Sequence, residues 1–193
     1  SNDPVYLGGS FHWDFLRLFH ELIQGLKKAS ISSKPVSMGI DTWGVDFGLL
    51  DTKGKLLGNP LHYRDHSTMG VMDEVFNTIS KEEIYQRTGI QFMQFNTLYQ
   101  LAAMKMNNPA ALDRASTLLF IPDLFRYFLT GEKNTEYTIA STSQMLNAKS
   151  CQWDNRLIEA LGIPVHFLTE IIPSGVIKGK IISSVCSQYD IDP

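Results

Sequence analysis

The stretch Gly39–Asp51 reads GIDTWGVDFGLLD, and it decides the fold. A polar turn that contains a glycine separates two apolar segments, a pattern typical of two buried strands. We therefore predict one strand over Pro35–Ile40 and another over Val45–Leu50. The turn residues Asp51-Thr52-Lys53-Gly54 then predict a hairpin into a third strand near Leu56–Leu57.

Signals for helix starts and ends occupy much of the remaining chain. They are cap residues or a proline at the start, and a glycine at the end. The further expected elements are a helix capped by Asp14 that runs to about Ala29, a short strand at Leu61–Tyr63, a helix between the capping box of Ser80 with Glu83 and Gly89, a helix capped by Asn96 that ends before Pro109, a buried strand over Leu118–Ile121, a helix from Pro122 to Gly131, a helix from about Asp154 to Leu161, and a tail of strand and loop from Pro173. Strands that alternate with helices imply an α/β fold, with helices flanking a mixed sheet.

The composition favours one globular domain over residues 1–193. Hydrophobic residues make up 44% of the 193 residues, enough for a core, and the net charge of -3 argues against nucleic acid as a partner. Apolar runs are too short to cross a membrane, and the first residues lack a secretion signal. We expect Cys151 and Cys186 to be free thiols, with a disulfide as the alternative, in a cytoplasmic protein.

The polar turn Asp41–Asp46 is the first candidate site. In open α/β sheets, ligands bind where strands end and connections diverge. A sugar site needs polar groups for hydroxyls, an aromatic wall, and room for backbone to approach the ligand. Asp41, Thr42 and Asp46 offer the first, Trp43 the second, and Gly44 the third because it has no Cβ. The residues alone favour a hairpin in which Gly44 only satisfies a turn.

Two further segments carry candidate polar groups. Arg64 and Asp65 can hydrogen-bond sugar hydroxyls, or can form an ion pair that orders a loop. Phe95 and Asn96 stand at a helix start whose amides can face a ligand, although the aromatic residue can equally be core. His62 and His66 have a metal-like spacing, but no third imidazole is near, so we expect no metal site.

Motifs of other chemistries are missing from the chain: G-x-S-x-G, H-E-x-x-H, a Walker loop and G-x-G-x-x-G. The segments that are present resemble the FGGY carbohydrate kinases, and within that family most closely the rhamnulokinase branch. The resemblance covers nearly the whole chain and rests on the following segments: DTWGVDF at 41–47, YRD at 63–65, YQRTGIQF at 85–92, FNTLYQL at 95–101, PD at 122–123, LTG at 129–131 and EYTIAS at 136–141.

The resemblance implies a ribonuclease H-like (actin-like ATPase) domain that lacks its first strands. It also implies that Gly44 contacts the ketose, with Trp43, Thr42 and Val45 beside it as substrate-binding residues. Further substrate-binding candidates are Asp41, Asp46, Arg64, Asp65, Phe95 and Asn96.

Catalytic, nucleotide and metal positions are not expected in this chain. In this family an H-D-T motif carries the catalytic aspartate, and its position lies beyond Pro193. The resemblance thus implies an intact enzyme that uses ATP and Mg²⁺, neither of which this piece is expected to bind tightly. The expected partners are L-rhamnulose or a related ketose and the rest of the kinase chain. The alternatives are a kinase for another ketose or sugar alcohol, and a non-catalytic sugar-binding module of actin-like fold.

Overall fold

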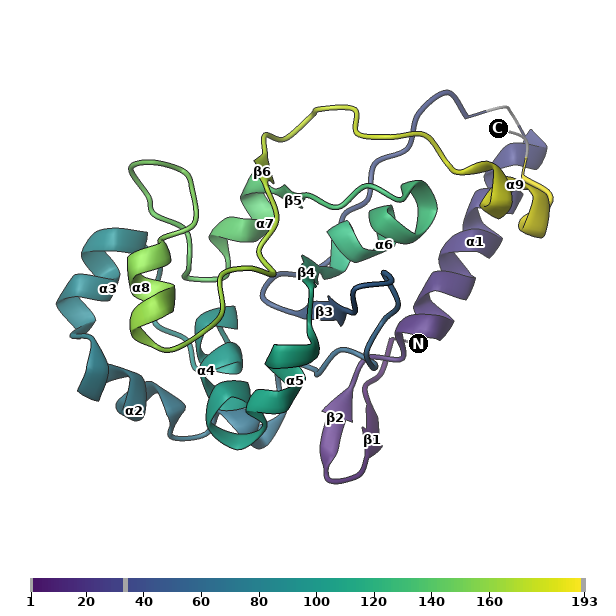
Figure 1. The fold of residues 1–193 in the computed structure, drawn as a ribbon. Coiled ribbons are helices and arrows are strands. Elements are labelled where there is room, and N and C mark those ends of the chain that lie inside the picture. The colour runs from purple at the N-terminus through teal and green to yellow at the C-terminus, as the bar shows by residue number, and fades with distance from the viewer. Residues whose placement is uncertain (1, 33–34, 192–193) are drawn as a thin grey trace.

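The computed structural model describes residues 2–32 and 35–191. Its strands form three two-stranded ladders, antiparallel in β1–β2 and β3–β4 and parallel in β5–β6, among helices of varied length (Figure 1). The strands are β1 (Val5–Leu7), β2 (Ser10–His12), β3 (Phe47–Leu50), β4 (Thr117–Phe120), β5 (Thr135–Glu136) and β6 (Ile171–Ile172). The helices are α1 (Phe15–Ser32), α2 (Val71–Thr78), α3 (Lys81–Thr88), α4 (Thr97–Asn107), α5 (Pro109–Arg114), α6 (Ile121–Thr130), α7 (Tyr137–Ser141), α8 (Asn155–Ala160) and α9 (Ser183–Tyr189), with a 3₁₀ turn at His66–Thr68. The predicted α/β class is confirmed.

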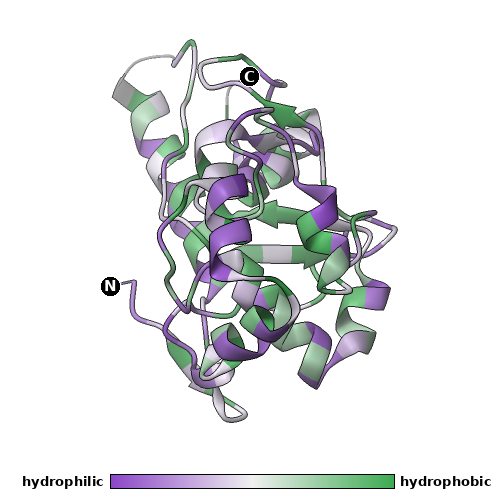
Figure 2. Cartoon of the chain, turned by 90° about the vertical axis from the view of Figure 1, so that its left-hand side faces the viewer, coloured by the Kyte–Doolittle hydropathy of each residue, from purple (hydrophilic) through white to green (hydrophobic). Residues whose placement is uncertain are grey.

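The β3–β4 ladder lies at the centre and is buried on both faces. Its register pairs Phe47 with Phe120 and Leu50 with Thr117. Because side chains alternate along a strand, Phe47 joins the larger core cluster while Leu50 joins the cluster under α1 and α6. Figure 2 shows hydrophobic residues concentrated in the central strands and hydrophilic residues on the surrounding helices.

Helices cover both sides of this ladder. On one side α4 contacts α2 and α5, and its residues from Thr97 to Ala103 are all buried. On the other side α1 packs against α6, where Phe15 stacks on Phe125 with ring centroids 4.8 Å apart. The chain therefore forms helix, strand and helix layers, as the buried strand pattern predicted.

Local signals were read correctly at most helix ends. The Asp14 carboxylate accepts from the Arg17 amide (3.2 Å), and the Ser80 hydroxyl accepts from the Glu83 amide (3.2 Å). Gly89 and Gly131 end α3 and α6 with φ of 66° and 80°. Each of these signals acts within one helical turn, which is why the sequence alone revealed them.

The predicted strands near Leu56–Leu57 and Leu61–Tyr63 are single bridges in the structure. The turn forms as predicted, with the Gly54 amide donating to the Asp51 carbonyl (3.0 Å), and Leu56 bridges Leu50. Leu61 bridges His12 of the β1–β2 hairpin. That hairpin was not predicted; its turn is the Gly8-Gly9 pair.

Two of the predicted elements differ from the structure. Pro35–Ile40 is not a strand: it is mostly exposed, with Val36 99% exposed, and no strand of the described residues pairs with it. An apolar segment becomes a strand only where a neighbour accepts and donates its backbone hydrogen bonds. The tail after Pro173 is not only strand and loop, because it includes α9, which buries Val185 and Cys186.

The two cysteines are free thiols, as predicted, with Cys186 buried and Cys151 partly so. Among the described residues no helix is long and apolar enough to cross a membrane.

Hydrogen bonds to the Asp154 side chain join α3 to α8. The Asp154 carboxylate accepts from Arg87 Nη1 at 3.1 and 3.2 Å, from Asn147 Nδ2 at 2.8 Å and from the Leu157 amide at 3.1 Å, which caps α8. Burial raises the pKa of Asp154, but the hydrogen bonds from Asn147, Leu157 and Arg87 outweigh it and hold the pKa below its usual range. The carboxylate is therefore the stable form.

Asp154→Ala should lower the free energy of unfolding by about 3 kcal/mol, because it removes a helix cap and leaves Arg87 without its buried partner. Chemical denaturation at pH 7 measures this. Arg156→Ala is the control, because it removes only an ion pair to Glu83 whose arginine side chain is 75% exposed, and it should cost less than about 1 kcal/mol. Equal losses for the two variants would contradict the structural role of Asp154.

Candidate functional site

The polar turn places its strain at Val45 rather than at Gly44. Val45 has a φ of 67°, whereas Gly44 is not among the residues with positive φ. The Asp46 amide donates to the Gly44 carbonyl (2.9 Å), so the three residues form a γ-turn with a β-branched residue at its strained centre. Gly44 is therefore part of a turn, but a positive φ is not what requires a glycine at this position.

Gly44 is close-packed against another segment. A Cβ built on Gly44 would lie 3.0 Å from both Cγ2 and Oγ1 of Thr142. The missing side chain thus makes room for Thr142, which follows α7.

Both ends of Val45 are held by side chains from distant elements. The Val45 amide donates to Thr142 Oγ1 (3.0 Å). The Val45 carbonyl accepts from Thr97 Oγ1 of α4 (2.6 Å) and, at 3.4 Å, from Gln100 Nε2. The strained residue therefore has every backbone hydrogen bond satisfied.

Asp46, the next residue, is a fully buried carboxylate surrounded by N–H donors. Its Oδ2 accepts from the indoles of Trp13 (2.5 Å) and Trp43 (3.0 Å) and from the Tyr63 amide (3.3 Å), and its Oδ1 accepts from Gln100 Nε2 (3.1 Å). Burial raises the pKa of Asp46 to about 6, against the opposing effect of these four donors. Asp46 is thus ionised at neutral pH and organises four separate segments.

An aromatic surface extends from this carboxylate. The Trp13 ring lies 4.2 Å from that of Trp43 and 4.1 Å from that of His62, and His62 stacks on Tyr63 at 4.6 Å. Tyr63 meets Phe95 edge-on at 5.6 Å. Trp13 and His62 are buried, whereas Trp43, Tyr63 and Phe95 stay partly exposed. The exposed members can face the apolar side of a sugar ring.

The structure brings only some of the predicted site residues together. Thr42, Trp43, Gly44, Val45 and Asp46 form the turn, and Phe95 joins through Tyr63. Asp41 is exposed next to the turn.

The other three predicted residues have local roles. Arg64 is exposed, with its guanidinium 5.2 Å from the Tyr63 ring centre. Asp65 makes no ion pair with it in the described part of the chain; its carboxylate accepts from the amides of Phe11 (2.7 Å) and Ser67 (3.0 Å). Asn96 is the N-cap residue of α4, as predicted, but its side chain makes no capping hydrogen bond; its Nδ2 donates to the Gln91 carbonyl and Gln144 Oε1.

Sequence reasoning missed Trp13, Tyr63, Thr97, Gln100 and Thr142 as parts of this candidate site. Gln100 lies inside the quoted FNTLYQL segment, so that motif carried a signal for it. Trp13 and Thr142 carried none, because each meets the turn only through the tertiary fold.

The predicted histidine pair does not converge on a metal position. His62 Nδ1 accepts from the Arg64 amide (3.0 Å), and His66 is exposed. Burial and the nearby Arg64 charge lower the pKa of His62. The structure, over the residues it describes, has no group of three His, Cys, Asp or Glu side chains placed to hold a metal.

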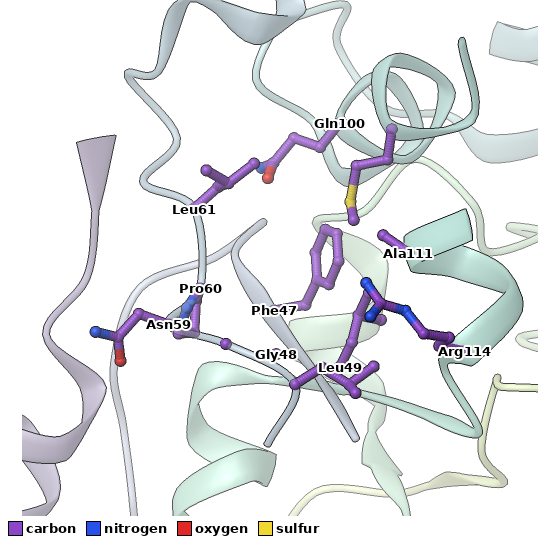
Figure 3. Close-up of a pocket in the computed structure, with 12 residues that line it drawn as sticks. Phe47, Gly48, Leu49, Asn59, Pro60, Leu61, Gln100, Ala111 and Arg114 are labelled. Carbon is purple, nitrogen blue, oxygen red and sulfur yellow. The ribbon is translucent and has the colours of Figure 1, made fainter. Parts of the chain in front are cut away.

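A cavity of about 160 Å³ lies on the α4 and α5 side of β3 (Figure 3). Its lining is mainly apolar, with Phe47 and Leu49 from β3 and Met104 from α4; Gln100 lies at the end nearest Leu61. Gln100 thus links the cavity to the Asp46 network. The mainly apolar lining suits a sugar less well than the aromatic surface does.

The chain is similar to proteins of a known family. Residues 9–192 match the model of the FGGY family of carbohydrate kinases, N-terminal domain. The chain is 42% identical over 192 residues to "Rhamnulokinase" of Oceanobacillus iheyensis and 45% identical over 192 residues to "Rhamnulokinase" of Halalkalibacterium halodurans. In both cases the alignment covers 99% of this chain and 41% of the relative, so the chain spans about two fifths of these proteins.

Solved structures show the same fold. The gluconate kinase from Lactobacillus acidophilus matches with a TM-score of 0.89 at 19% identity, covering 100% of this chain and 40% of that one. The xylulose kinase from Rhodospirillum rubrum also has a TM-score of 0.89, at 16% identity, covering 99% and 41%. The fold is thus the ribonuclease H-like fold of the sugar kinases, as the sequence resemblance implied.

The raised pKa of Asp46 has a testable consequence for stability. The folded state binds the proton more tightly than the unfolded state, where the value is 3.8. The contribution of Asp46 is therefore fully present below pH 3.8, is lost as the pH rises toward 6, and stays lost above. Relative to Asp46→Asn, the wild type should lose roughly 3 kcal/mol across that window. Paired denaturation curves measure the difference, and a pH-independent difference would contradict the shift.

Proposed function

Because the chain belongs to the FGGY family of carbohydrate kinases, we propose that residues 1–193 form the single, sugar-binding N-terminal domain of an ATP-dependent ketose kinase. The intact protein would transfer a phosphoryl group from ATP to the 1-hydroxyl of L-rhamnulose. The choice of L-rhamnulose as the substrate rests on one observation. Over nearly its whole length the chain is 42% and 45% identical to relatives named rhamnulokinase.

The turn at Thr42–Val45 is the proposed sugar contact. Trp43 and its partly exposed aromatic neighbours Tyr63 and Phe95 give the apolar wall, and the Gly44 backbone lies shortly before the start of β3. Asp41, Thr42 and Arg64 are the proposed hydroxyl-binding side chains, since all three reach the surface. Asp46, Asp65 and Asn96 are buried and hydrogen-bonded within the chain, which supports a role in holding the site rather than in contacting the sugar.

The rest of the kinase chain is the proposed partner of this domain. It would hold ATP with Mg²⁺ and supply the aspartate that accepts the proton of the sugar hydroxyl. In phosphoryl transfer the metal and positioned donors stabilise charge on the transferred group. The role of the present chain is to bind and orient the ketose, and the setting we propose is the cytoplasm.

The experiment on the full-length kinase is a coupled assay with MgATP against a panel of L-rhamnulose, L-fuculose, D-xylulose and glycerol. We expect kcat/KM to be highest for L-rhamnulose, with kcat in the usual range of about 1–1000 per second. Residues 1–193 alone should show background turnover, because the proposed nucleotide and base groups lie elsewhere. A higher kcat/KM for another sugar would contradict the assignment of L-rhamnulose as the substrate. Turnover by residues 1–193 alone would contradict the proposal that the rest of the kinase chain supplies the nucleotide site and the base.

Trp43 should affect the sugar selectively. In the full-length kinase Trp43→Ala should raise KM for the ketose about tenfold, equivalent to about 1.4 kcal/mol, and leave KM for ATP within about twofold. Trp43→Phe keeps an aromatic wall but loses the hydrogen bond to Asp46, so a smaller effect is expected.

Trp153→Phe is the matched control for Trp43. It likewise removes one indole hydrogen bond, that to the Thr169 carbonyl at 2.7 Å, away from the turn. It should lower the melting temperature without a selective change in KM. A Trp43→Ala variant with equal changes in both KM values would count against the sugar wall.

A further inference from the structure

We infer that Thr142, together with Thr97, is a positioning residue for the sugar contact: the two hydroxyls hold Val45 in its strained conformation and so fix the Gly44 backbone. This inference rests on the proposed function. Neither threonine is expected to touch the sugar.

The hydroxyl of Thr142 is directed by its own hydrogen bonds. It donates its only proton to the Ile139 carbonyl (2.8 Å), which leaves a lone pair for the Val45 amide at 3.0 Å. The same side chain lies 3.0 Å from the position that a Cβ of Gly44 would take. Thr142 therefore sets both the orientation of the Val45 amide and the path of the residue before it.

Thr97 acts on the opposite end of Val45. Its hydroxyl is completely buried and donates to the Val45 carbonyl at 2.6 Å. The two threonines, one in α4 and one directly after α7, thus hold the two ends of Val45, and the hydrogen bonds of the Asp46 side chain fix the next residue. A β-branched residue with positive φ costs free energy, and such residues persist only where the surroundings over-determine them.

The segment that carries Thr142 also supports the other half of the candidate site. The Ser143 carbonyl accepts from the Leu98 amide (3.0 Å), and Gln144 Oε1 accepts from Asn96 Nδ2 (3.0 Å). Gln144 is itself held at a φ of 61° and is completely buried. Residues 142–144 therefore fix the turn and the start of α4 relative to each other.

The test uses steady-state kinetics of the full-length kinase, with thermal melts of every variant. Thr142→Val keeps the volume against Gly44 but removes the hydroxyl, and it should raise KM for L-rhamnulose at least tenfold while KM for ATP stays within twofold. Thr142→Ser keeps the hydroxyl and should stay within threefold of wild type. Thr97→Val acts on the other end of the same residue and should reproduce the selective rise in KM, which covers the case in which Thr142→Val fails to fold.

Thr88→Val is the matched control. The Thr88 hydroxyl is also buried, donates to a backbone carbonyl (Ile84, 2.9 Å) and accepts from a backbone amide (Ile90, 3.4 Å), but it does not touch the turn. It should lower the melting temperature without a selective change in KM. A purely structural role for Thr142 predicts that Thr142→Val behaves like this control, and that result would overturn the inference.

A Val45→Gly variant tests whether the threonines act through the strained backbone of residue 45. Glycine adopts positive φ at no steric cost, so in a Val45→Gly variant the hydrogen bonds of Thr142 and Thr97 are no longer needed to hold residue 45 in this conformation. In that background Thr142→Val should raise KM less than threefold, whereas an undiminished tenfold rise would overturn the strain argument. The proposed function and this inference are contradicted by different results. If the wild-type enzyme prefers another sugar, the assignment of L-rhamnulose is wrong. The same variants are then compared with that sugar, and the comparison still tests the role of the two threonines.

Discussion

The buried carboxylate of Asp46 is the constraint around which the site is arranged. Four N–H groups donate to it, from the segment between β2 and α1, from the polar turn, from the segment before the 3₁₀ turn and from α4. An ionised group that is removed from water is tolerated only when its lone pairs are satisfied, so none of the four segments can move away without a large cost. The aromatic surface, built from Trp13, Trp43 and Tyr63, takes its shape from this requirement.

The range of the contacts that stabilise each element explains which sequence predictions were right. Helix ends depend on contacts within a few residues, and those at Asp14, Ser80 and Gly131 were found from the sequence. Pro35–Ile40 had the composition of a buried strand, but a strand also depends on a pairing partner that composition does not contain. The helix α9 was missed because Gly, Pro and β-branched residues precede it, and its amphipathic face is only seven residues long.

The candidate site was predictable only where its residues are neighbours in the sequence. The motif DTWG identified the turn, but its contacts with Trp13, Gln100 and Thr142 span 33, 54 and 97 residues. No local pattern records such contacts. Asp65 and Asn96 show the reverse error: their residue types suit a ligand, yet their polar groups are used inside the protein.

Gly44 shows how one residue can satisfy two demands. The direction in which a side chain would project is filled by Thr142, so an added methyl group would meet protein before it met a ligand. A sugar that contacts Gly44 must therefore approach the backbone from another side, where the partly exposed Trp43 ring lies next to it in the chain. The Gly44 carbonyl accepts from the Asp46 amide and keeps a second lone pair, so the carbonyl, the backbone N–H and the Cα hydrogens are the groups that Gly44 offers to a sugar. The packing of Thr142 behind the turn thus accounts for the glycine, and the sugar contact that we propose would use the surface on the other side.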